Sequence, residues 1–186
     1  IGGFHGGDPK DPKFQELLVR WFEYGTFCPV MRLHGYRWPL QPQYGTTGGA
    51  TCVSGAPNEV WSYTDQVCEI LSDYLRLRER MLPYITELME EAHEKGTPVM
   101  RPLFYDFPED KESWNVETEY MFGPKVLVKP ITDADARETD VYLPGGASWT
   151  NAWTGETFEG GQKVHVAAPI EQIPLFTRDG YKLPMK

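Results

Sequence analysis

Two polar side chains, Arg32 and His34, stand at the end of a short apolar run near the start of the chain. The run from Phe27 to Leu33 has the length and composition of one buried strand. Barrel enzymes present their sites on polar groups that follow a rigid strand in this way. A histidine at the end of a strand is also often a hydrogen-bonded structural residue, so both roles stay open for His34 at this point.

A glycine-rich segment, residues 1–7, opens the chain and carries Phe4 and His5 as its bulky side chains. Glycine lets the backbone adopt unusual conformations and approach a ligand closely. The segment lacks the glycine spacing of a dinucleotide-binding loop, and no Lys-Ser/Thr pair follows it as in a phosphate-binding loop. It is therefore either a flexible loop tip or one wall of a site that binds neither nucleotide nor phosphate.

The element that must connect these two segments is a helix. Asp11 and Pro12 are typical of a helix cap and a first helical position, and Gly25 is placed to end the helix. Apolar residues recur between them at a spacing of three and four, which predicts one buried stripe. The stripe comprises Phe14, Leu17, Leu18, Trp21 and Phe22. A helix followed by a strand after a short turn favours a β/α fold.

A long loop over residues 36–57 follows His34 and contains the aromatic residues Tyr36, Trp38 and Tyr44. Unstructured loops longer than about 12 to 15 residues are usually functional or disordered. In an enzyme acting on sugars, the rings would stack on pyranose faces, which makes Trp38 a candidate substrate contact. Alternatively, the rings fold the loop onto the body of the protein.

The helical spacing returns over residues 64–94, and Pro83 should divide this stretch into two helices near Leu82. The charge run from Arg76 to Arg80 is interpreted as a solvated or salt-bridged face. A second short strand is expected over residues 98–104, where Arg101 either anchors a structural carboxylate or touches a ligand.

The last part of the chain changes in character. A short helical piece is expected over residues 114–122, followed by strands separated by glycine-containing turns, which favours an antiparallel β-sandwich. The strands are expected at 125–131, 137–143, 147–153, 162–168 and 173–178. Two β/α-type strands in the first hundred residues cannot close a barrel. We therefore expect the first part to be the end of a barrel whose earlier strands belong to polypeptide outside this sequence.

Composition narrows the possible partners. The 186 residues are 40% hydrophobic, enough for a core, and carry a net charge of -9, which argues against a nucleic-acid partner. The cysteines Cys28, Cys52 and Cys68 cannot all pair, and their spacing suits neither zinc nor redox chemistry. They favour a reduced, cytoplasmic compartment. No apolar run is long enough to span a bilayer, so no membrane partner is expected.

Several short motifs, taken in order, resemble the C-terminal part of glycoside hydrolase family 31, which comprises α-glucosidases, α-xylosidases and their relatives. The motifs are Ile1-Gly2-Gly3-Phe4, Arg20-Trp21, Pro29-Val30-Met31-Arg32-Leu33-His34-Gly35, Leu82-Pro83-Tyr84, Arg101-Pro102-Leu103-Phe104, Gly123, Tyr142-Leu143-Pro144, Trp153-Thr154-Gly155 and Ile173-Pro174-Leu175-Phe176. Each motif alone is short, but their common order along nearly the whole chain is specific.

The resemblance implies the last strands and helices of a (β/α)8 barrel over residues 1–103 and a proximal β-sandwich domain over residues 104–186. It also implies a retaining glycosidase with two catalytic aspartates, both upstream of Ile1, so that this chain holds no catalytic residue. His34 corresponds to the family histidine that hydrogen-bonds a sugar hydroxyl, and Phe4 to an aromatic residue that lines the pocket. Arg32 matches a recurrent arginine that either touches sugar or orients a carboxylate. An oligosaccharide and the missing N-terminal part are the implied partners, without cofactor or metal.

Two other interpretations remain. One is a non-catalytic carbohydrate-binding or scaffold module that uses the aromatic loop and the β-domain. The other, a metal hydrolase, is disfavoured because the four histidines lack the spacing of metal ligands; they are His5, His34, His93 and His165. The loop carboxylates Asp8, Asp11 and Glu59 are better explained as helix caps or solvated charges than as catalytic groups.

Overall fold

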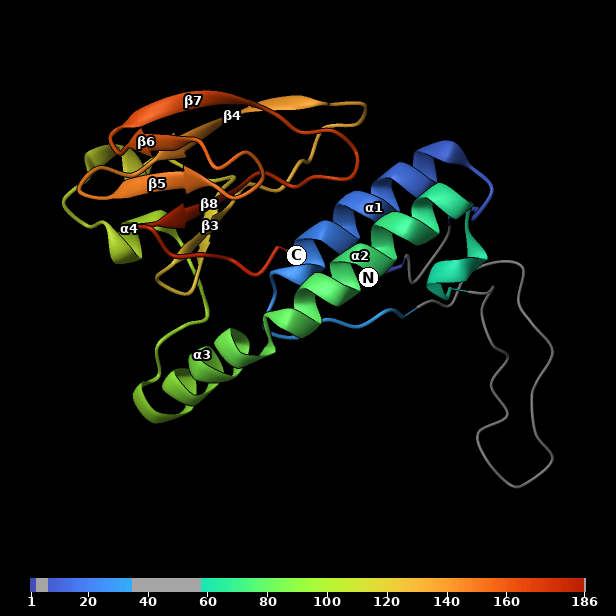
Figure 1. Ribbon diagram of the computed structural model, residues 1–186, viewed down its shortest axis with the longest axis horizontal. Coiled ribbons are helices and arrows are strands. Elements are labelled where there is room, and N and C mark those ends of the chain that lie inside the picture. The colour runs from blue at the N-terminus through green and yellow to red at the C-terminus, as the bar shows by residue number, and fades with distance from the viewer. Residues whose placement is uncertain (3–6, 35–57, 186) are drawn as a thin grey trace.

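A computed structural model describes residues 1–2, 7–34 and 58–185 of the chain. Its first half consists of helices: α1 (Pro12–Thr26), the short 3-10 helix η1 (Val60–Ser62), α2 (Asp65–Arg80) and α3 (Leu82–Lys95). Its second half is mostly β-structure. Figure 1 shows α1 and α2 lying side by side next to the strands, with α3 below them. None of the helices in the described ranges is long and apolar enough to cross a bilayer.

Helix α1 begins as its sequence predicts. The Asp11 side chain accepts a hydrogen bond from the backbone N–H of Lys13, and proline follows in the first turn. Phe14, Leu18 and Phe22 are buried. The predicted stripe is nevertheless too wide, because Leu17 is 55% exposed and Trp21 is 39% exposed. In the described chain, these two side chains lie on a face of α1 that no other element covers.

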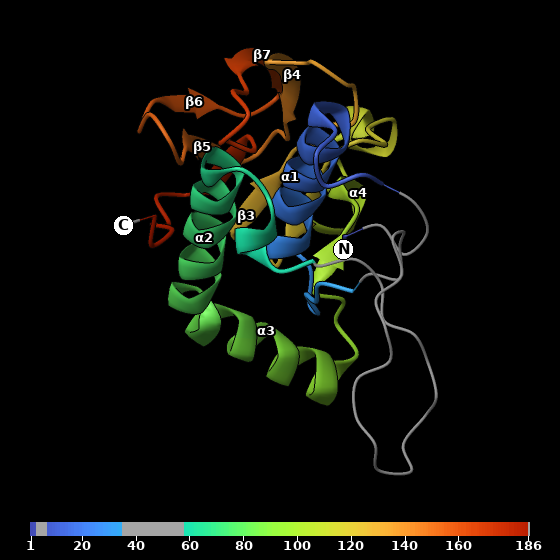
Figure 2. The ribbon, with the colours of Figure 1, turned by 90° about the vertical axis from the view of Figure 1, so that its right-hand side faces the viewer.

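The long helical stretch is divided as expected. Met81 separates α2 from α3, and Pro83 lies in the first turn of α3, where its missing N–H costs no helical hydrogen bond. Figure 2 shows α3 turning sharply away from α2 at this point. Gly96 ends α3 in a left-handed conformation with φ of 70°.

The prediction of a strand over Phe27–Leu33 is wrong. Residues 27–30 form a turn and bends, and no regular strand is present between Phe27 and His34. A strand needs hydrogen-bonding neighbours, and Ile1 is a backbone partner of Arg32 and His34 in the described ranges. The backbone of His34 donates to the Ile1 carbonyl at 2.8 Å.

The β-strands form two antiparallel sheets. The larger has the order β1-β2-β3-β8-β5-β6, and the smaller pairs β4 with β7. Their bounds are β1 Met100–Arg101, β2 Tyr120–Phe122, β3 Val126–Val128, β4 Glu138–Leu143, β5 Ser148–Asn151, β6 Thr157–Glu159, β7 Gln162–Ala167 and β8 Leu175–Arg178. Short helices α4 (Leu103–Asp106) and η2 (Lys111–Trp114) connect β1 to β2.

Side chains alternate between the two faces of a strand. In the larger sheet, each of the two faces packs against another part of the chain. Leu127 and Phe176 pack between the two sheets with Val141 of β4. Val126 and Leu175 point the other way and join the core of the helices. The helices, the large sheet and the small sheet therefore pack on one another as three successive layers (Figure 1).

Two local predictions in the second half are wrong. The segment 114–122 is not helical beyond Trp114, because Tyr120–Phe122 pairs with both β1 and β3. The strand expected over 98–104 is limited to Met100–Arg101, and Leu103 begins α4 instead. In both cases pairing with distant strands decides the local structure.

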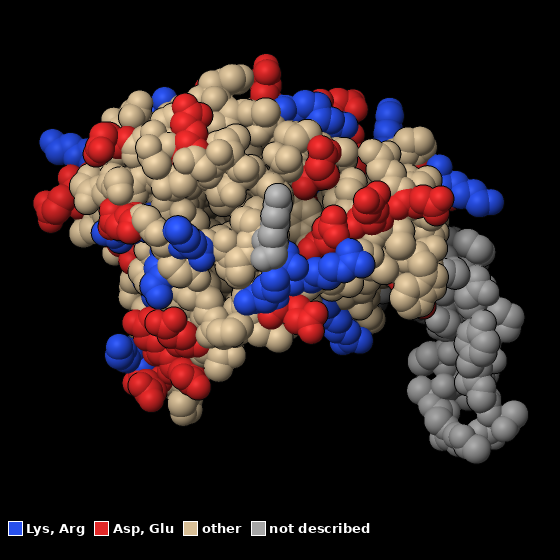
Figure 3. Space-filling view, in the orientation of Figure 1, with Lys and Arg blue, Asp and Glu red and all other residues tan. Residues whose placement is uncertain are grey.

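Charges on the surface are mixed. In the orientation of Figure 3, basic and acidic side chains alternate over α2 and the sheets, and acidic side chains gather at the free end of α3. That end of α3 contains Glu90, Glu91 and Glu94. Charged residues on exposed helix faces are typical of solvated surfaces.

Candidate functional site at the strand ends

Two backbone hydrogen bonds place the start of the chain beside residues 32–34. The N-terminal nitrogen of Ile1 donates to the Arg32 carbonyl at 3.1 Å, and the His34 N–H donates to the Ile1 carbonyl at 2.8 Å. Ile1 thus donates to the residue before Leu33 and accepts from the residue after it, which is the hydrogen-bond pattern of two parallel segments. Ile1 and Leu33 are therefore opposite one another, and the two segments run in the same direction.

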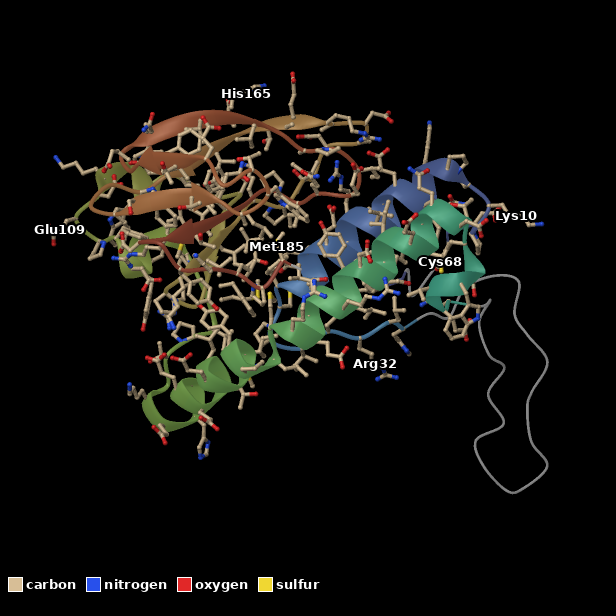
Figure 4. The ribbon with its side chains drawn as sticks, viewed as in Figure 1. Lys10, Arg32, Cys68, Glu109, His165 and Met185 are labelled. Carbon is tan, nitrogen blue, oxygen red and sulfur yellow. The ribbon has the colours of Figure 1, made fainter. Side chains whose placement is uncertain are left out.

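Side chains alternate along residues 31–34. Met31 and Leu33 pack against the core formed by the helices. Arg32 and His34 are exposed and lie on the opposite face. Figure 4 shows the Arg32 side chain extending away from α1 and α2. One face of this stretch therefore faces the helices, and the other presents the two polar side chains that the sequence singled out.

Of the four predicted substrate contacts, the structure brings Arg32 and His34 onto one face. Phe4 and Trp38 lie outside the described residues. Gly2, which leads to Phe4, and His34, which leads to the loop with Trp38, follow directly after the paired positions Ile1 and Leu33.

Asn58 and Tyr63 are neighbours of this edge that the sequence analysis missed. Gly2 has φ of 108°, and a Cβ atom built there would lie 2.3 Å from Asn58 Nδ2. Asn58 thus packs directly against the Gly2 backbone. The Tyr63 hydroxyl donates to Asn58 Oδ1 at 2.7 Å and holds the amide in place. Glycine at position 2 was the available signal, but nothing local indicated which residue approaches it.

The three loop carboxylates have structural contacts. Asp11 caps α1, and Asp8 Oδ1 accepts from the Lys10 N–H at 2.9 Å. Glu59 accepts from the Ser62 hydroxyl at 3.0 Å and from the Asn58 N–H at 3.1 Å. Each carboxylate therefore stabilises a turn or a helix start.

The described histidines, His34, His93 and His165, lie on different elements of the fold. His93 lies in the last turn of α3. His165, on the outer face of β7, contacts Asp140 Oδ1 through Nδ1 at 2.8 Å, and these bonds with Asp140 and then Glu138 raise its pKa. Among residues 1–2, 7–34 and 58–185, no group of three or more His, Cys, Asp or Glu side chains is arranged to hold a metal ion.

Arg78 does not belong to a solvated or salt-bridged face, as the sequence predicted for the run from Arg76 to Arg80. Its guanidinium donates to three carbonyl groups of the turn before residues 31–34, those of Thr26 at 2.6 Å, Cys28 at 2.8 Å and Pro29 at 3.0 Å. Arg76, in contrast, forms an exposed pair with Asp73 at 2.7 Å, as the run predicted. Arg78 thus fixes the segment that leads to Arg32 and His34.

Arg101 is held by protein groups. Its side chain is buried, donates through Nε to the Pro98 carbonyl at 2.7 Å and pairs with Asp106 at 3.1 Å. Of the two roles left open by the sequence, these contacts correspond to anchoring a structural carboxylate. Burial raises the pKa of Asp106, and Arg101 opposes this shift.

Two family models match consecutive parts of the chain. The model described as "Glycosyl hydrolases family 31 TIM-barrel domain" matches residues 1–88. The model described as "Glycosyl hydrolase family 31 C-terminal domain" matches residues 96–183. Together they cover the helical part with its parallel backbone pairing and the antiparallel sheets.

Individual relatives agree with these models. The chain is 37% identical to an α-xylosidase from Saccharolobus solfataricus over 99% of its own length, which is 23% of that protein. It is 36% identical to α-glucosidase 2 from Bacillus thermoamyloliquefaciens, with 89% of this chain and 19% of that protein covered. The chain therefore spans about a quarter of such relatives, or less.

A solved structure shows the same arrangement. It is a GH31 α-xylosidase from a soil metagenome complexed with xylose, with 49% identity and a TM-score of 0.91 over 98% of this chain and 27% of the other. Taken with the two models, this likeness confirms the expected order of a barrel portion followed by an antiparallel β-domain. The chain belongs to glycosyl hydrolase family 31 and consists of the end of the family's barrel and its C-terminal domain.

Proposed function

We propose that this chain supplies one wall of the sugar-binding pocket of a retaining α-glycosidase. The observation that carries the proposal is the parallel pairing of Ile1 with Leu33, beside which Arg32 and His34 are exposed on one face. The ends of parallel barrel strands are where such enzymes build their sites. The names of the relatives support a substrate with a terminal α-xylosidic or α-glucosidic bond.

The proposed roles follow from what a pyranose offers, namely hydroxyl edges and apolar C–H faces. His34 hydrogen-bonds a sugar hydroxyl, and Phe4 lines the pocket with its ring. Arg32 either contacts the sugar or orients a carboxylate, and Trp38 stacks on a sugar ring from the loop.

Both catalytic carboxylates, in this proposal, belong to polypeptide upstream of Ile1. One attacks the anomeric carbon and forms a glycosyl-enzyme. The other protonates the leaving oxygen and then activates the water that releases the sugar. The 186-residue chain alone is therefore expected to hydrolyse neither substrate.

The uncovered face of α1 supports the proposal that another part of the same enzyme packs against this chain. Leu17 and Trp21 lie one turn apart on one side of the helix and are exposed, and the partly exposed Tyr24 continues this side up to its edge-on contact with Tyr120. A contiguous apolar face of this kind is typical of a contact surface. We propose that the preceding part of the polypeptide covers it and so completes the barrel.

The domain boundary stays a prediction. The sequence predicts the boundary between residues 103 and 104, at the start of α4. The pairing of β1 with β2 supports an earlier boundary, before Met100. The gap between the two matched models, residues 89–95, lies within α3 and is consistent with that position.

The test is a kinetic comparison in the complete enzyme with aryl α-xyloside and aryl α-glucoside as substrates. His34→Ala should lower turnover on the preferred substrate by roughly 100-fold, as expected when one group that binds the transition state is lost. The thermal unfolding midpoint should remain close to the unmodified value, because His34 is exposed. His93→Ala, which removes an exposed imidazole on α3, is the matched control and should leave turnover unchanged.

Unchanged kinetics in the His34→Ala enzyme on the preferred substrate would remove this residue from the site. A complete protein that binds the sugars but hydrolyses neither would instead favour the non-catalytic carbohydrate-binding module.

A further inference from the structure

A buried polar cluster joins the helices to the β-domain. Arg20 and Glu23 lie one turn apart on α1, and Arg20 Nη1 donates to Glu23 Oε2 at 3.0 Å. Tyr74 of α2 reaches the same carboxylate, with 3.0 Å between its hydroxyl and Glu23 Oε1. Glu23 is 0% exposed and Arg20 is 6% exposed. All three side chains of the cluster belong to this chain and are already buried in it.

The β-domain contributes backbone carbonyls to the cluster. Arg20 Nη2 donates to Ala168 at 2.7 Å and to Ala136 at 3.1 Å, and Nη1 donates to Pro169 at 3.1 Å. These acceptors precede β4 or follow β7 in the chain. Figure 1 shows the segment after β7 extending toward α1. Arg20 thus fastens two β-domain segments to the helix through neutral acceptors that spread its positive charge.

The Tyr74 hydroxyl has three neighbours but one proton. It accepts a hydrogen bond from the Ile173 N–H at 3.0 Å. Its proton can be donated either to Glu23 Oε1 at 3.0 Å or to the Glu171 carbonyl at 3.1 Å. One donor cannot satisfy two separate acceptors fully. The protonation state of Glu23 decides which acceptor receives it.

When Glu23 is protonated, its carboxyl O–H donates to the Tyr74 oxygen, and Tyr74 then donates to the Glu171 carbonyl. When Glu23 is ionised, Tyr74 donates to the carboxylate, and the Glu171 carbonyl loses this donor. We propose that Arg20, Glu23 and Tyr74 form a proton-dependent joint, in which protonation of Glu23 tightens the attachment of residues 168–173 to α1 and α2.

The electrostatic surroundings of Glu23 support titration near neutral pH. Burial is the largest influence and raises the pKa of Glu23 to about 8. Arg20 and Tyr74 oppose this shift, whereas the charge of Glu171 adds to it. Burial also raises the pKa of Tyr74 well above its ordinary range, so the hydroxyl keeps its proton throughout.

The direction of the pH effect follows from these values. In an unfolded chain Glu23 ionises near its usual pKa of 4.5, far below the value of about 8 in the folded protein. Stabilisation from the protonated joint is therefore complete below about pH 4.5 and is lost as the pH rises toward 8.

The joint can be tested by hydrogen exchange in the complete protein, followed by mass spectrometry on a peptide covering residues 168–176. After correction for intrinsic exchange rates, protection should fall about tenfold between pH 7 and pH 9, as does the protonated fraction of a group with a pKa of about 8. Glu23→Gln, which mimics the protonated carboxyl, should keep the peptide protected across this range.

Tyr74→Phe should lower protection at every pH and should move the fall in protection to higher pH, because Tyr74 opposes the rise in the pKa of Glu23. Tyr84→Phe is the matched control, because the Tyr84 hydroxyl bonds the Phe122 carbonyl at 2.9 Å in another part of the large sheet. It should leave the 168–176 peptide unchanged. Parallel pH profiles for the unmodified and Glu23→Gln proteins would overturn the proposal, as would a folded Tyr74→Phe protein with unaltered protection.

Discussion

Ile1 and Leu33 are opposite one another in a parallel backbone pairing, although the whole of α1 separates them in sequence. Parallel neighbours require a crossover connection, and here that connection is α1. Gly25 allows the helix to pack closely, because a Cβ atom built there would lie 2.2 Å from the Ile1 side chain. The pairing thus positions Arg32 and His34 although the described residues around it form no regular parallel sheet.

Leu17 and Leu18 should respond differently to truncation in the 186-residue chain. Leu18→Ala removes a side chain that is 1% exposed and should lower the free energy of unfolding by about 2 to 5 kcal/mol through the cavity that remains. Leu17→Ala should change it by no more than about 0.5 kcal/mol, as is usual for surface substitutions. Urea denaturation of both variants measures the difference.

The same pair also tests the proposed contact with the rest of the enzyme. If the preceding polypeptide covers α1, Leu17→Ala should become clearly destabilising in the complete protein. An equally small loss in both contexts would show that this face stays open to solvent.

Gly123→Ala should destabilise the protein more than Gly96→Ala does. Both glycines have positive φ, 60° and 70°, so each substitution introduces backbone strain of about 1 kcal/mol or more. A Cβ atom at position 123 would also lie 2.3 Å from the Tyr84 hydroxyl and 2.5 Å from Leu88. A Cβ atom at position 96 would meet no atom of another part of the described chain within 4 Å. Thermal unfolding midpoints of the two variants compare these costs, and equal midpoints would contradict the packing described here.

Arg78→Met should lower the free energy of unfolding by about 3 kcal/mol. The change leaves three carbonyls of the turn at residues 26–29 without their charged donor, and hydrogen bonds to charged groups are worth about 1.5 to 3 kcal/mol each without adding fully. Arg76→Met is the control, since its exposed pair with Asp73 should contribute less than about 1 kcal/mol. Chemical denaturation of both proteins checks the contrast, and similar losses would argue against the clamp.

His165 should titrate above its usual range because Asp140 and Glu138 hydrogen-bond its imidazole and raise its pKa. A raised pKa stabilises the folded state below the unfolded pKa of about 6.5, and this contribution is lost as the pH rises through the folded value. An NMR titration should show a lower pKa in Asp140→Asn. Glu138→Gln should have the smaller effect, since its contact is longer, 3.4 Å against 2.8 Å. The reverse order would show that Glu138 dominates.

The sequence by itself determined the features that depend on near neighbours in the chain. Asp11 and Pro12 start α1, Pro83 divides the second helical stretch, and Gly96 ends it, because caps and backbone conformations are set within a few residues. The ordered motifs also identified the family.

Tertiary structure alone decided the features that depend on distant partners. Tyr120–Phe122 is a strand because β1 and β3 flank it, and Leu17 is exposed because nothing in the described chain covers that side of α1. Arg78 bonds a turn some fifty residues away, and the residue that packs on Gly2 proved to be Asn58. Local periodicity records which side chains are apolar or charged, but hydrogen bonds and packing between distant segments determine where each of them is placed.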